Sequence, residues 1–203
     1  MREALLSRKQ ASENRRTAIL EAARTVFARQ GYAATVVEDI AIQAGIGKGT
    51  LYLYFPSKEQ IYFAALLEDA RRLDAETREV MANAGDWQAA IRAYVMVRLR
   101  YFEAHGDFLR IFLTEFRSMC MFGKPLNTEL SRLTQDGEAQ LAQMFAAAAA
   151  RGEIRAVDPE LAALTVSDLT RGLMERRLRQ WGRPLGPSDA EFGLDLLCRG
   201  LQA

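Results

Sequence analysis

Histidine and cysteine are scarce in this 203-residue chain, and their scarcity excludes several kinds of chemistry. The chain has one histidine, His105, and two distant cysteines, Cys120 and Cys198. These residues form neither a zinc-ligand pattern nor a Cys–His nucleophile. A glycine-rich phosphate loop and a Ser-His-Asp set are also missing. We therefore expect no enzyme, no metal and no cofactor, and two reduced thiols in a cytoplasmic protein.

Long apolar runs are missing as well. No run reaches the ~18 residues that a membrane span needs, and the longest stretch of small apolar residues, Met144–Ala150, has the composition of a helix. The first 16 residues are polar and charged, without the apolar region of a signal peptide. The sequence predicts a soluble, cytoplasmic, globular chain without a membrane partner.

Strand signals are almost absent, whereas helix signals recur along the whole chain. We find no alternating β-branched runs with Asn-Gly turns, and an all-α fold is predicted. Ser57, Asp86 and Asp158 are expected to begin helices. Glycines expected to end helices in the left-handed conformation are Gly31, Gly45 and Gly152. The expected helices span residues 13–30, 36–44, 48–54, 58–81, 87–104, 108–120, 126–151, 159–181 and 188–201.

Charge is distributed unevenly between the two ends of the chain. The whole chain carries a net charge of +1, but residues 1–58 hold nine basic and five acidic residues, a net charge of +4, and the remainder has a net charge of −3. This asymmetry indicates that only the N-terminal part meets a polyanion. The same charges can also serve only to solvate a face of the protein.

The segment Thr35–Ile61 has the pattern of two short helices joined by a tight turn. The first expected helix ends at Ala44-Gly45, and the second begins about three residues later. This spacing predicts a helix-turn-helix. Thr35 precedes Glu38 by three residues, which predicts a capping box at the start of the first helix. The apolar positions expected to hold the pair together are Ile40, Ala41, Ala44, Ile46 and Leu51.

The outer face of the second helix of this pair is polar and aromatic. A lysine or a hydroxyl can bond to base edges, and tyrosine hydroxyls commonly contact phosphates. Gly47 and Gly49 would let the backbone come close to a phosphate at the helix start. The candidate nucleic-acid contacts are Thr35, Gly47, Lys48, Gly49, Thr50, Tyr52, Tyr54 and Lys58.

This segment resembles the DNA-binding domain of the TetR family of bacterial repressors. The resemblance covers residues 13–62 and departs from the commonest pattern at Gly47, where many members have serine and where glycine is an accepted N-cap. The residues that match the family pattern are Thr35, Val36, Ile40, Ala41, Ala44, Gly45, Ile46, Gly49, Leu51, Tyr52, Tyr54, Phe55, Ser57, Lys58 and Ile61.

The resemblance implies a three-helix head, residues 1–57, that binds double-stranded operator DNA, and a six-helix body, residues 58–203, for ligand binding and dimerisation. Base contacts would come from Lys48, Thr50 and Tyr52, and phosphate contacts from Thr35, Tyr54 and Lys58. Each residue also has a plain structural alternative. The tyrosines can be packing residues, Lys48 a solvated lysine, Thr35 a helix cap, and the two glycines parts of the turn.

The body is expected to form a homodimer and to bind a small molecule. The two C-terminal helices are rich in large apolar residues, which fits the usual dimer interface of the family, although these residues can also complete a monomer core. The effector is expected to be largely apolar or aromatic, although an aromatic stripe is also compatible with an ordinary core. The candidate ligand contacts are Tyr94, Arg98, Tyr101, Phe112, Phe116, Met144, Asp168 and Arg171. Asp168 is expected among apolar neighbours, where a charge needs a partner.

Together these features predict a repressor that a small effector releases from its operator. The effector would shift the population toward a state whose two heads are wrongly spaced for the DNA, through the rigid helix at 58–81. Three alternatives remain: an architectural DNA-binding protein without an effector, an activator, and an enzyme. A body without a pocket would favour the first, promoter position decides the second, and the missing catalytic residues oppose the third.

Overall fold

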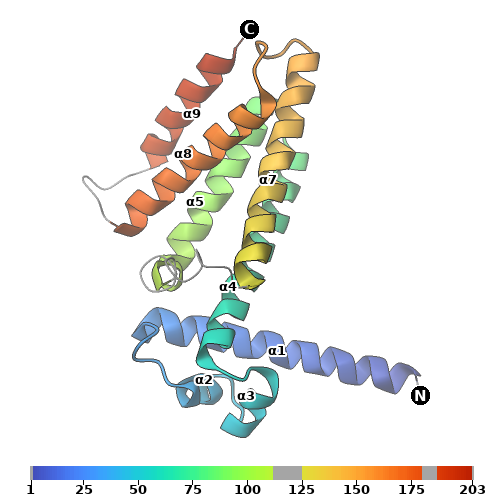
Figure 1. Ribbon diagram of the computed structural model, residues 1–203, viewed down its shortest axis with the longest axis vertical. Coiled ribbons are helices and arrows are strands. Elements are labelled where there is room, and N and C mark those ends of the chain that lie inside the picture. Colours follow the sequence, from blue (N-terminus) through green and yellow to red (C-terminus); the bar gives the residue numbers. More distant parts are fainter. Residues whose placement is uncertain (1, 112–124, 180–186, 203) are drawn as a thin grey trace. The chain divides into compact units, whose positions relative to one another are not determined.

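The computed structural model describes residues 2–111, 125–179 and 187–202, and these residues are almost entirely helical (Figure 1). An isolated antiparallel bridge joins Ile154 and Gln202. The all-α expectation is confirmed. The helices are α1 (Arg2–Gln30), α2 (Val37–Gln43), α3 (Lys48–Tyr54), α4 (Lys58–Ala82), α5 (Trp87–Ile111), α7 (Pro125–Ala150), α8 (Pro159–Arg179) and α9 (Pro187–Leu201).

The described residues form two compact units that divide inside α4. The first unit contains the residues up to Asp69 together with 107–111, and the second contains 70–106 and the described residues from 125 onward. The first half of α4 packs with the N-terminal helices, because Ile61, Tyr62 and Ala65 are fully buried. By packing, α4 therefore belongs to both units, whereas the sequence pattern placed all of it with the body.

Aromatic rings form the centre of the first unit. Phe27 of α1 meets Tyr62 of α4 edge to face, with ring centroids 5.3 Å apart, and Tyr62 lies 4.9 Å from the ring of Phe108. The Tyr62 hydroxyl donates a hydrogen bond of 3.1 Å to the Phe108 carbonyl oxygen. A buried ion pair of 2.5 Å joins Arg24 of α1 to Asp69 of α4. These contacts fix the first half of α4 against α1.

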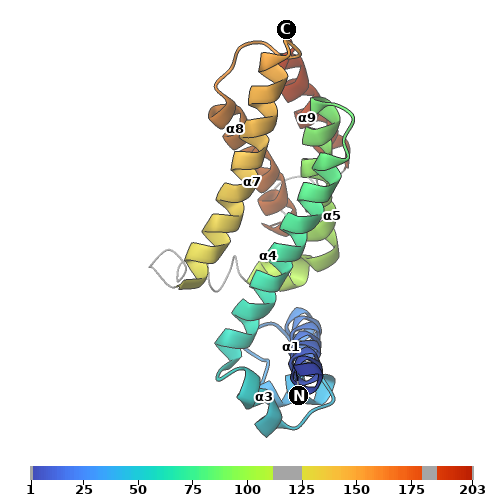
Figure 2. The same ribbon diagram turned by 90° about the vertical axis from the view of Figure 1, so that its right-hand side faces the viewer.

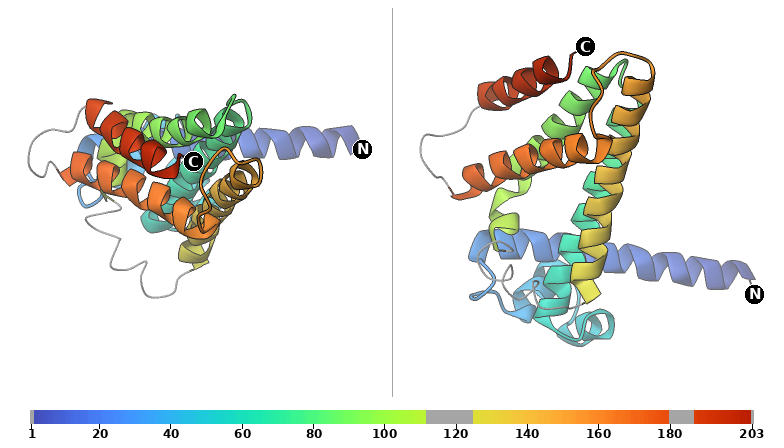
Figure 3. Two further views of the ribbon diagram at one scale, coloured as in Figure 1. Left: turned by 90° about the horizontal axis from the view of Figure 1, so that it is seen from above. Right: turned by 45° about the horizontal axis from the view of Figure 1, so that its top comes forward.

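Helix α1 begins much earlier than the expected start at residue 13. It spans Arg2–Gln30, and Figures 1 and 3 show its N-terminal part projecting beyond α2 and α3. No glycine or proline interrupts residues 2–30, and residues 4–6 and 8–11 are mostly good helix formers. The expected boundary was wrong because the pattern of buried residues starts only at Ile19, whereas the helix itself needs no buried face to continue.

Most of the predicted helix ends are confirmed. Gly31, Gly45 and Gly152 have φ values of 79°, 66° and 72°, the left-handed conformation that favours glycine. The Asp158 carboxylate accepts hydrogen bonds from the backbone N–H groups of residues 160 and 161 at 2.9 and 3.2 Å. Asp86 caps α5 in the same way through a 2.7 Å bond to residue 89.

Among the described residues, the second unit packs α5, α7, α8, α9 and the second half of α4 around one apolar core (Figures 2 and 3). Large buried side chains come from every helix, among them Met81, Ile91, Phe145, Val166 and Leu194. Helix α5 continues to Ile111, and the break expected at Gly106 is instead a kink at His105, where φ is −123° and ψ is 17°. The expected helix at 108–120 falls mainly outside the described residues.

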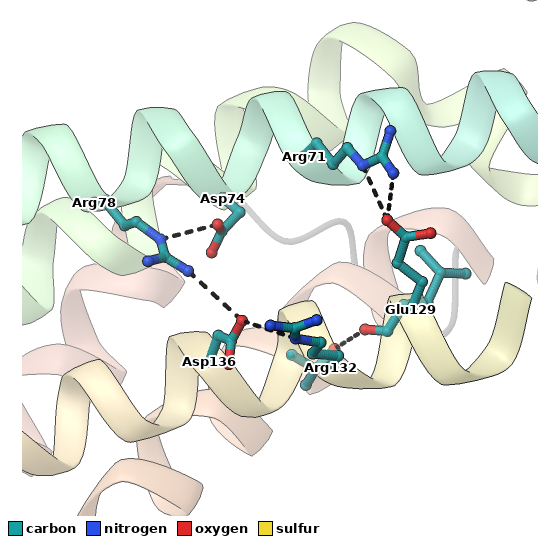
Figure 4. Close-up of polar contacts among 8 residues, drawn as sticks. Arg71, Asp74, Arg78, Glu129, Arg132 and Asp136 are labelled. Atoms are coloured by element: carbon teal, nitrogen blue, oxygen red, sulfur yellow. Dashed lines mark hydrogen bonds and ion pairs between the residues drawn. The ribbon is translucent and has the colours of Figure 1, made fainter.

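Ion pairs connect α4 and α7 along the outside of this bundle (Figure 4). Arg71 of α4 donates to the Glu129 carboxylate, and Arg78 lies 2.9 Å from Asp74 and 3.9 Å from Asp136 of α7. Most of these side chains are about half exposed, so each pair contributes little stability by itself. They do fix how the second half of α4 aligns with α7.

Candidate nucleic-acid interface

Helices α2 and α3 form the predicted helix-turn-helix. Gly45 adopts the left-handed conformation directly after α2, and the Ile46 N–H donates to the Ala41 carbonyl oxygen at 3.0 Å. Ile40, Ala41 and Leu51 are buried between the helices, as expected, and Ala44 and Ile46 are half-buried. The turn is therefore tight enough to fix the direction of α3 relative to α2.

The outer face of α3 is open to solvent. Lys48, Gly49 and Tyr52 are exposed, and Thr50 and Tyr54 are half-buried. Leu53 is 84% exposed, the highest value among the exposed large apolar side chains. Sequence reasoning missed Leu53 because an apolar residue in a short helix is usually assigned to the core. The sequence did contain a signal for its exposure. Leu53 follows Leu51 by two residues, so if Leu51 is buried, Leu53 lies on the opposite face of the helix, beside Tyr52.

The two glycines at the start of α3 meet no steric demand from the protein. A Cβ atom added at Gly47 or Gly49 would find nothing within 4 Å, and φ at Gly47 is −71°. A side chain would therefore fit at both positions in the isolated protein. Packing within the protein therefore does not require glycine at either position.

Lys48 is paired with an acidic side chain of α2. Its ammonium donates a hydrogen bond to the Glu38 carboxylate and lies 5.9 Å from the centre of the Tyr52 ring. This hydrogen bond is the main reason that the pKa of Glu38 is lowered and the pKa of Lys48 is raised from their ordinary values. Both groups are exposed, so a DNA phosphate or base can replace the carboxylate.

The side chains of Thr35 and Lys58 make contacts that the sequence did not predict. Val36, not Thr35, is the N-cap of α2, and it makes no side-chain capping bond. The Thr35 side chain is buried, and its hydroxyl donates to the Gly31 carbonyl oxygen at 2.7 Å. The expected capping box was therefore wrong. The hydroxyl instead closes the turn that follows α1.

The Lys58 ammonium bonds to the loop between α1 and α2. It donates to the carbonyl oxygens of Tyr32 at 2.7 Å and Thr35 at 2.8 Å, with a longer contact of 3.4 Å to Ala33. It also lies 4.4 Å from the centre of the Tyr32 ring. An ammonium group has three N–H donors, and all three are directed at these carbonyls. In this arrangement Lys58 holds the protein's own backbone, and its phosphate contact stays a prediction.

In the second unit, two of the ligand candidates lie against each other. The Arg98 guanidinium stacks on the Tyr94 ring at 3.8 Å and donates to the Thr77 hydroxyl at 2.9 Å. A Cβ atom added at Gly137 of α7 would lie 3.3 Å from Arg98 Nη2. Burial is the main influence on the pKa of Arg98 and lowers it. Within the described part of the chain, Arg98 forms no ion pair at 4.0 Å or less.

The other ligand candidates that the structure describes make contacts elsewhere. Asp168 was expected among apolar side chains, but it is 65% exposed and pairs with Arg171 at 2.9 Å. The expectation was wrong because the buried neighbours Val166 and Thr170 lie on the other side of α8. Tyr101 packs on the His105 ring, and Met144 is half-buried against the core. Phe112 and Phe116 lie outside the described residues.

Helices α8 and α9 expose several large apolar side chains. Leu161 and Leu164 of α8 and Phe192 and Leu196 of α9 are between 42% and 67% exposed. A groove of about 370 Å³ lies between these helices and is lined mainly by apolar residues such as Leu161 and Leu197. The helices approach closely at Gly193, where an added Cβ atom would lie 3.2 Å from Leu169. Contiguous exposed apolar surface is typical of sites that bind a protein, a membrane or a ligand.

No helix among the described residues is both long enough and apolar enough to cross a membrane.

Comparisons with known proteins agree with this architecture. The family described as "Bacterial regulatory proteins, tetR family" matches residues 19–65, and the C-terminal domain of AefR-like transcriptional repressors matches residues 92–192. The HTH-type transcriptional repressor KstR2 of Rhodococcus jostii is 34% identical over 124 residues, which span 59% of this chain and 61% of that repressor. The HTH-type transcriptional regulator RutR of Escherichia coli is 32% identical over 158 residues, or 75% of this chain and 70% of RutR.

A solved structure is similar to this chain over most of its length. The ketosteroid transcriptional regulator KstR2 of Mycobacterium tuberculosis superposes with a TM-score of 0.66 at 25% identity, covering 93% of this chain and 95% of that one. The matches therefore include both the helix-turn-helix and the helical body. This chain belongs to the TetR family of bacterial regulators, which are DNA-binding transcriptional regulators.

Proposed function

We propose that this chain represses transcription by binding operator DNA as a homodimer through α3, and that a small, largely apolar or aromatic effector releases it. In this proposal the chain catalyses no reaction. It is located in the cytoplasm, where it meets the DNA. One observation carries it: α3 buries Leu51 completely while Lys48, Tyr52 and Leu53 on its outer face stay exposed. A helix with this division can enter a major groove without unfolding the head.

The proposed contacts divide between base edges and phosphates. Lys48, Thr50 and Tyr52 face base edges, Leu53 offers an apolar surface to a thymine methyl group, and Tyr54 meets a phosphate. Gly47 and Gly49 leave room for a close phosphate, which agrees with the open space around them. Thr35 and Lys58 act indirectly, because their hydrogen bonds hold the loop before α2.

The proposed dimer uses α8 and α9. One helix-turn-helix recognises too few base pairs, and two heads about 34–36 Å apart can bind successive major grooves. The exposed leucines and Phe192 on these two helices would be covered by the same residues of a second copy, as expected for an interface with two-fold symmetry.

The proposed effector carries an acidic group that binds to the Arg98 guanidinium. The half-buried Arg98 guanidinium donates to the Thr77 hydroxyl and forms no ion pair within the described part of the chain, which leaves donors for a carboxylate, and the Tyr94 ring would pack against the apolar part. The relative KstR2 is described as a ketosteroid regulator, which fits an apolar effector. Because α4 runs through both units, a shift of its second half can alter the head.

Fluorescence anisotropy tests the DNA part of the proposal. Purified protein is titrated into a labelled duplex from upstream of its own gene and into a scrambled duplex of equal length, over a series of salt concentrations. We expect tighter binding to the upstream duplex by about 10³-fold or more and weaker binding as salt rises. Equal binding to both duplexes and to further genomic fragments would reject sequence-selective repression.

The effector part is tested on the same complex with paired small molecules. A panel of aliphatic and aromatic carboxylates is compared with the neutral amides of the same carbon skeletons. We expect a carboxylate to release the DNA at a concentration about tenfold or more below that of its amide. Arg98→Gln should remove this preference, whereas the exposed control Arg100→Gln should keep it. A preference that survives Arg98→Gln would refute the role of Arg98.

A further inference from the structure

Helix α1 begins with residues whose described side chains, from Lys9 to Arg15, do not pack in the head. We call residues 2–16 the N-terminal extension. The side chains of residues 9–15 are all exposed, and from residue 9 onward the first buried side chain of α1 is that of Ile19. The family match also starts at residue 19. The extension is therefore helix that the family's shared DNA-binding fold does not require.

The extension contains most of the net positive charge of the head. Residues 2–16 hold five basic and two acidic residues, a net charge of +3. The basic residues between 17 and 58 are fewer, and three of the four have partners: Arg24 binds Asp69, Lys48 binds Glu38, and Lys58 binds main-chain carbonyls. Among the described residues, Lys9 and Arg15 form no ion pair at 4.0 Å or less.

The basic residues follow one side of the helix toward α3. Residues seven apart on an α-helix lie on nearly the same face, so Lys9 and Arg16 form one row, and Arg15 lies in a neighbouring row. At the inner end, the Arg16 guanidinium lies 5.3 Å from the centre of the Phe55 ring. Phe55 is the C-cap of α3. The row that contains Arg16 therefore ends beside the C-terminal end of α3.

A helix with this composition needs a partner to be stable. A polar helix without tertiary packing is marginal in water, and positive charge near its N-terminus opposes the helix dipole. Phosphate groups would relieve both effects. From Arg2 to Arg16 the helix is about 21 Å long at ~1.5 Å per residue, which corresponds to about six base pairs of duplex.

We propose that the N-terminal extension binds the phosphate backbone of the duplex that flanks each operator half-site. The proposal rests on DNA binding by the head, because the partner is the same duplex continued outward. The contacts are electrostatic and add affinity for any sequence, whereas α3 supplies the sequence preference. The extension therefore lengthens the bound site without changing the bases that it prefers.

The test uses the full-length double variant Lys9→Gln/Arg15→Gln, which removes two exposed charges and keeps good helix formers. Full-length Arg100→Gln/Arg132→Gln is the matched control, because it removes two exposed charges from the second unit. Anisotropy is measured over a salt series on the upstream duplex in a short form and in a form extended by about six base pairs per side. A random-sequence duplex at low salt is the third probe.

For Lys9→Gln/Arg15→Gln we expect the magnitude of the slope of log K against log salt to fall by about 3.6, because the homodimer loses four phosphate contacts and each contributes about 0.9. Flank extension should tighten the binding of the wild-type protein and the control but not of the variant. An unchanged slope and an unchanged response to the flanks would overturn the inference. If the protein has no operator preference, the variant should still show the smaller slope on the random-sequence duplex. Failure of the repressor proposal can therefore be distinguished from failure of this inference.

Discussion

Replacing Lys58 by methionine separates a positioning role from a phosphate contact. Methionine keeps much of the length of the side chain and removes the ammonium, which donates short hydrogen bonds to the carbonyl oxygens of Tyr32 and Thr35. Hydrogen bonds to charged groups contribute about 1.5–3 kcal/mol each. Because Lys58 is partly exposed, water compensates part of the loss. We expect the free energy of unfolding to fall by about 2 kcal/mol.

DNA binding gives the second half of this prediction. Without Lys58 the loop before α2 loosens, so affinity for the upstream duplex should fall, but the salt slope should not change because no phosphate contact is lost. Urea unfolding and anisotropy over a salt series measure the two effects. Lys48→Met is the matched control, an exposed lysine whose loss should alter DNA binding with little effect on unfolding. A slope lower by about 1.8, one contact of about 0.9 for each protomer of the dimer, with unchanged stability would refute the positioning role of Lys58.

Three further changes test separate contacts. Asp69→Asn leaves the buried Arg24 guanidinium without its charge partner and should lower the free energy of unfolding by about 3–5 kcal/mol; a loss below about 1 kcal/mol in urea unfolding would contradict the importance of this pair. Glu38→Gln releases Lys48 and should tighten DNA binding in the anisotropy assay, so weaker binding would argue against a DNA role for Lys48. Leu196→Glu places a charge on the exposed apolar face of α9 and should give monomers in sedimentation velocity, whereas an intact dimer would exclude this interface.

Local features of the fold could be predicted from the sequence because they depend on neighbouring residues. The left-handed conformation of Gly45, the cap at Asp158 and the buried Leu51 each follow from the chemistry of a few adjacent positions. The same local rules recognised the outer face of α3. They missed Leu53 because exposure of an apolar side chain reverses the usual assignment.

Features that depend on distant parts of the chain could not be predicted in this way. The Lys58 ammonium bonds to the Tyr32 carbonyl 26 residues earlier, so its role inside the head left no local signal. Asp168 has apolar neighbours in sequence, but the buried positions of α8 follow the spacing of Ala163, Val166 and Thr170. The extra turns of α1 were missed because helix length was inferred from buried residues alone.

Selection of DNA from a random library tests the central claim most directly. Full-length wild-type protein and the variants Thr50→Ala and Lys48→Ala each select duplexes over several rounds, and the enriched sequences are compared. We expect the wild-type protein to enrich a palindrome whose half-sites lie about 10 base pairs apart. Each variant should lose preference at one or two positions within the half-site while keeping the spacing. Bound DNA without an enriched sequence, or variants that select the same sequence as the wild-type protein, would contradict recognition of the operator by α3.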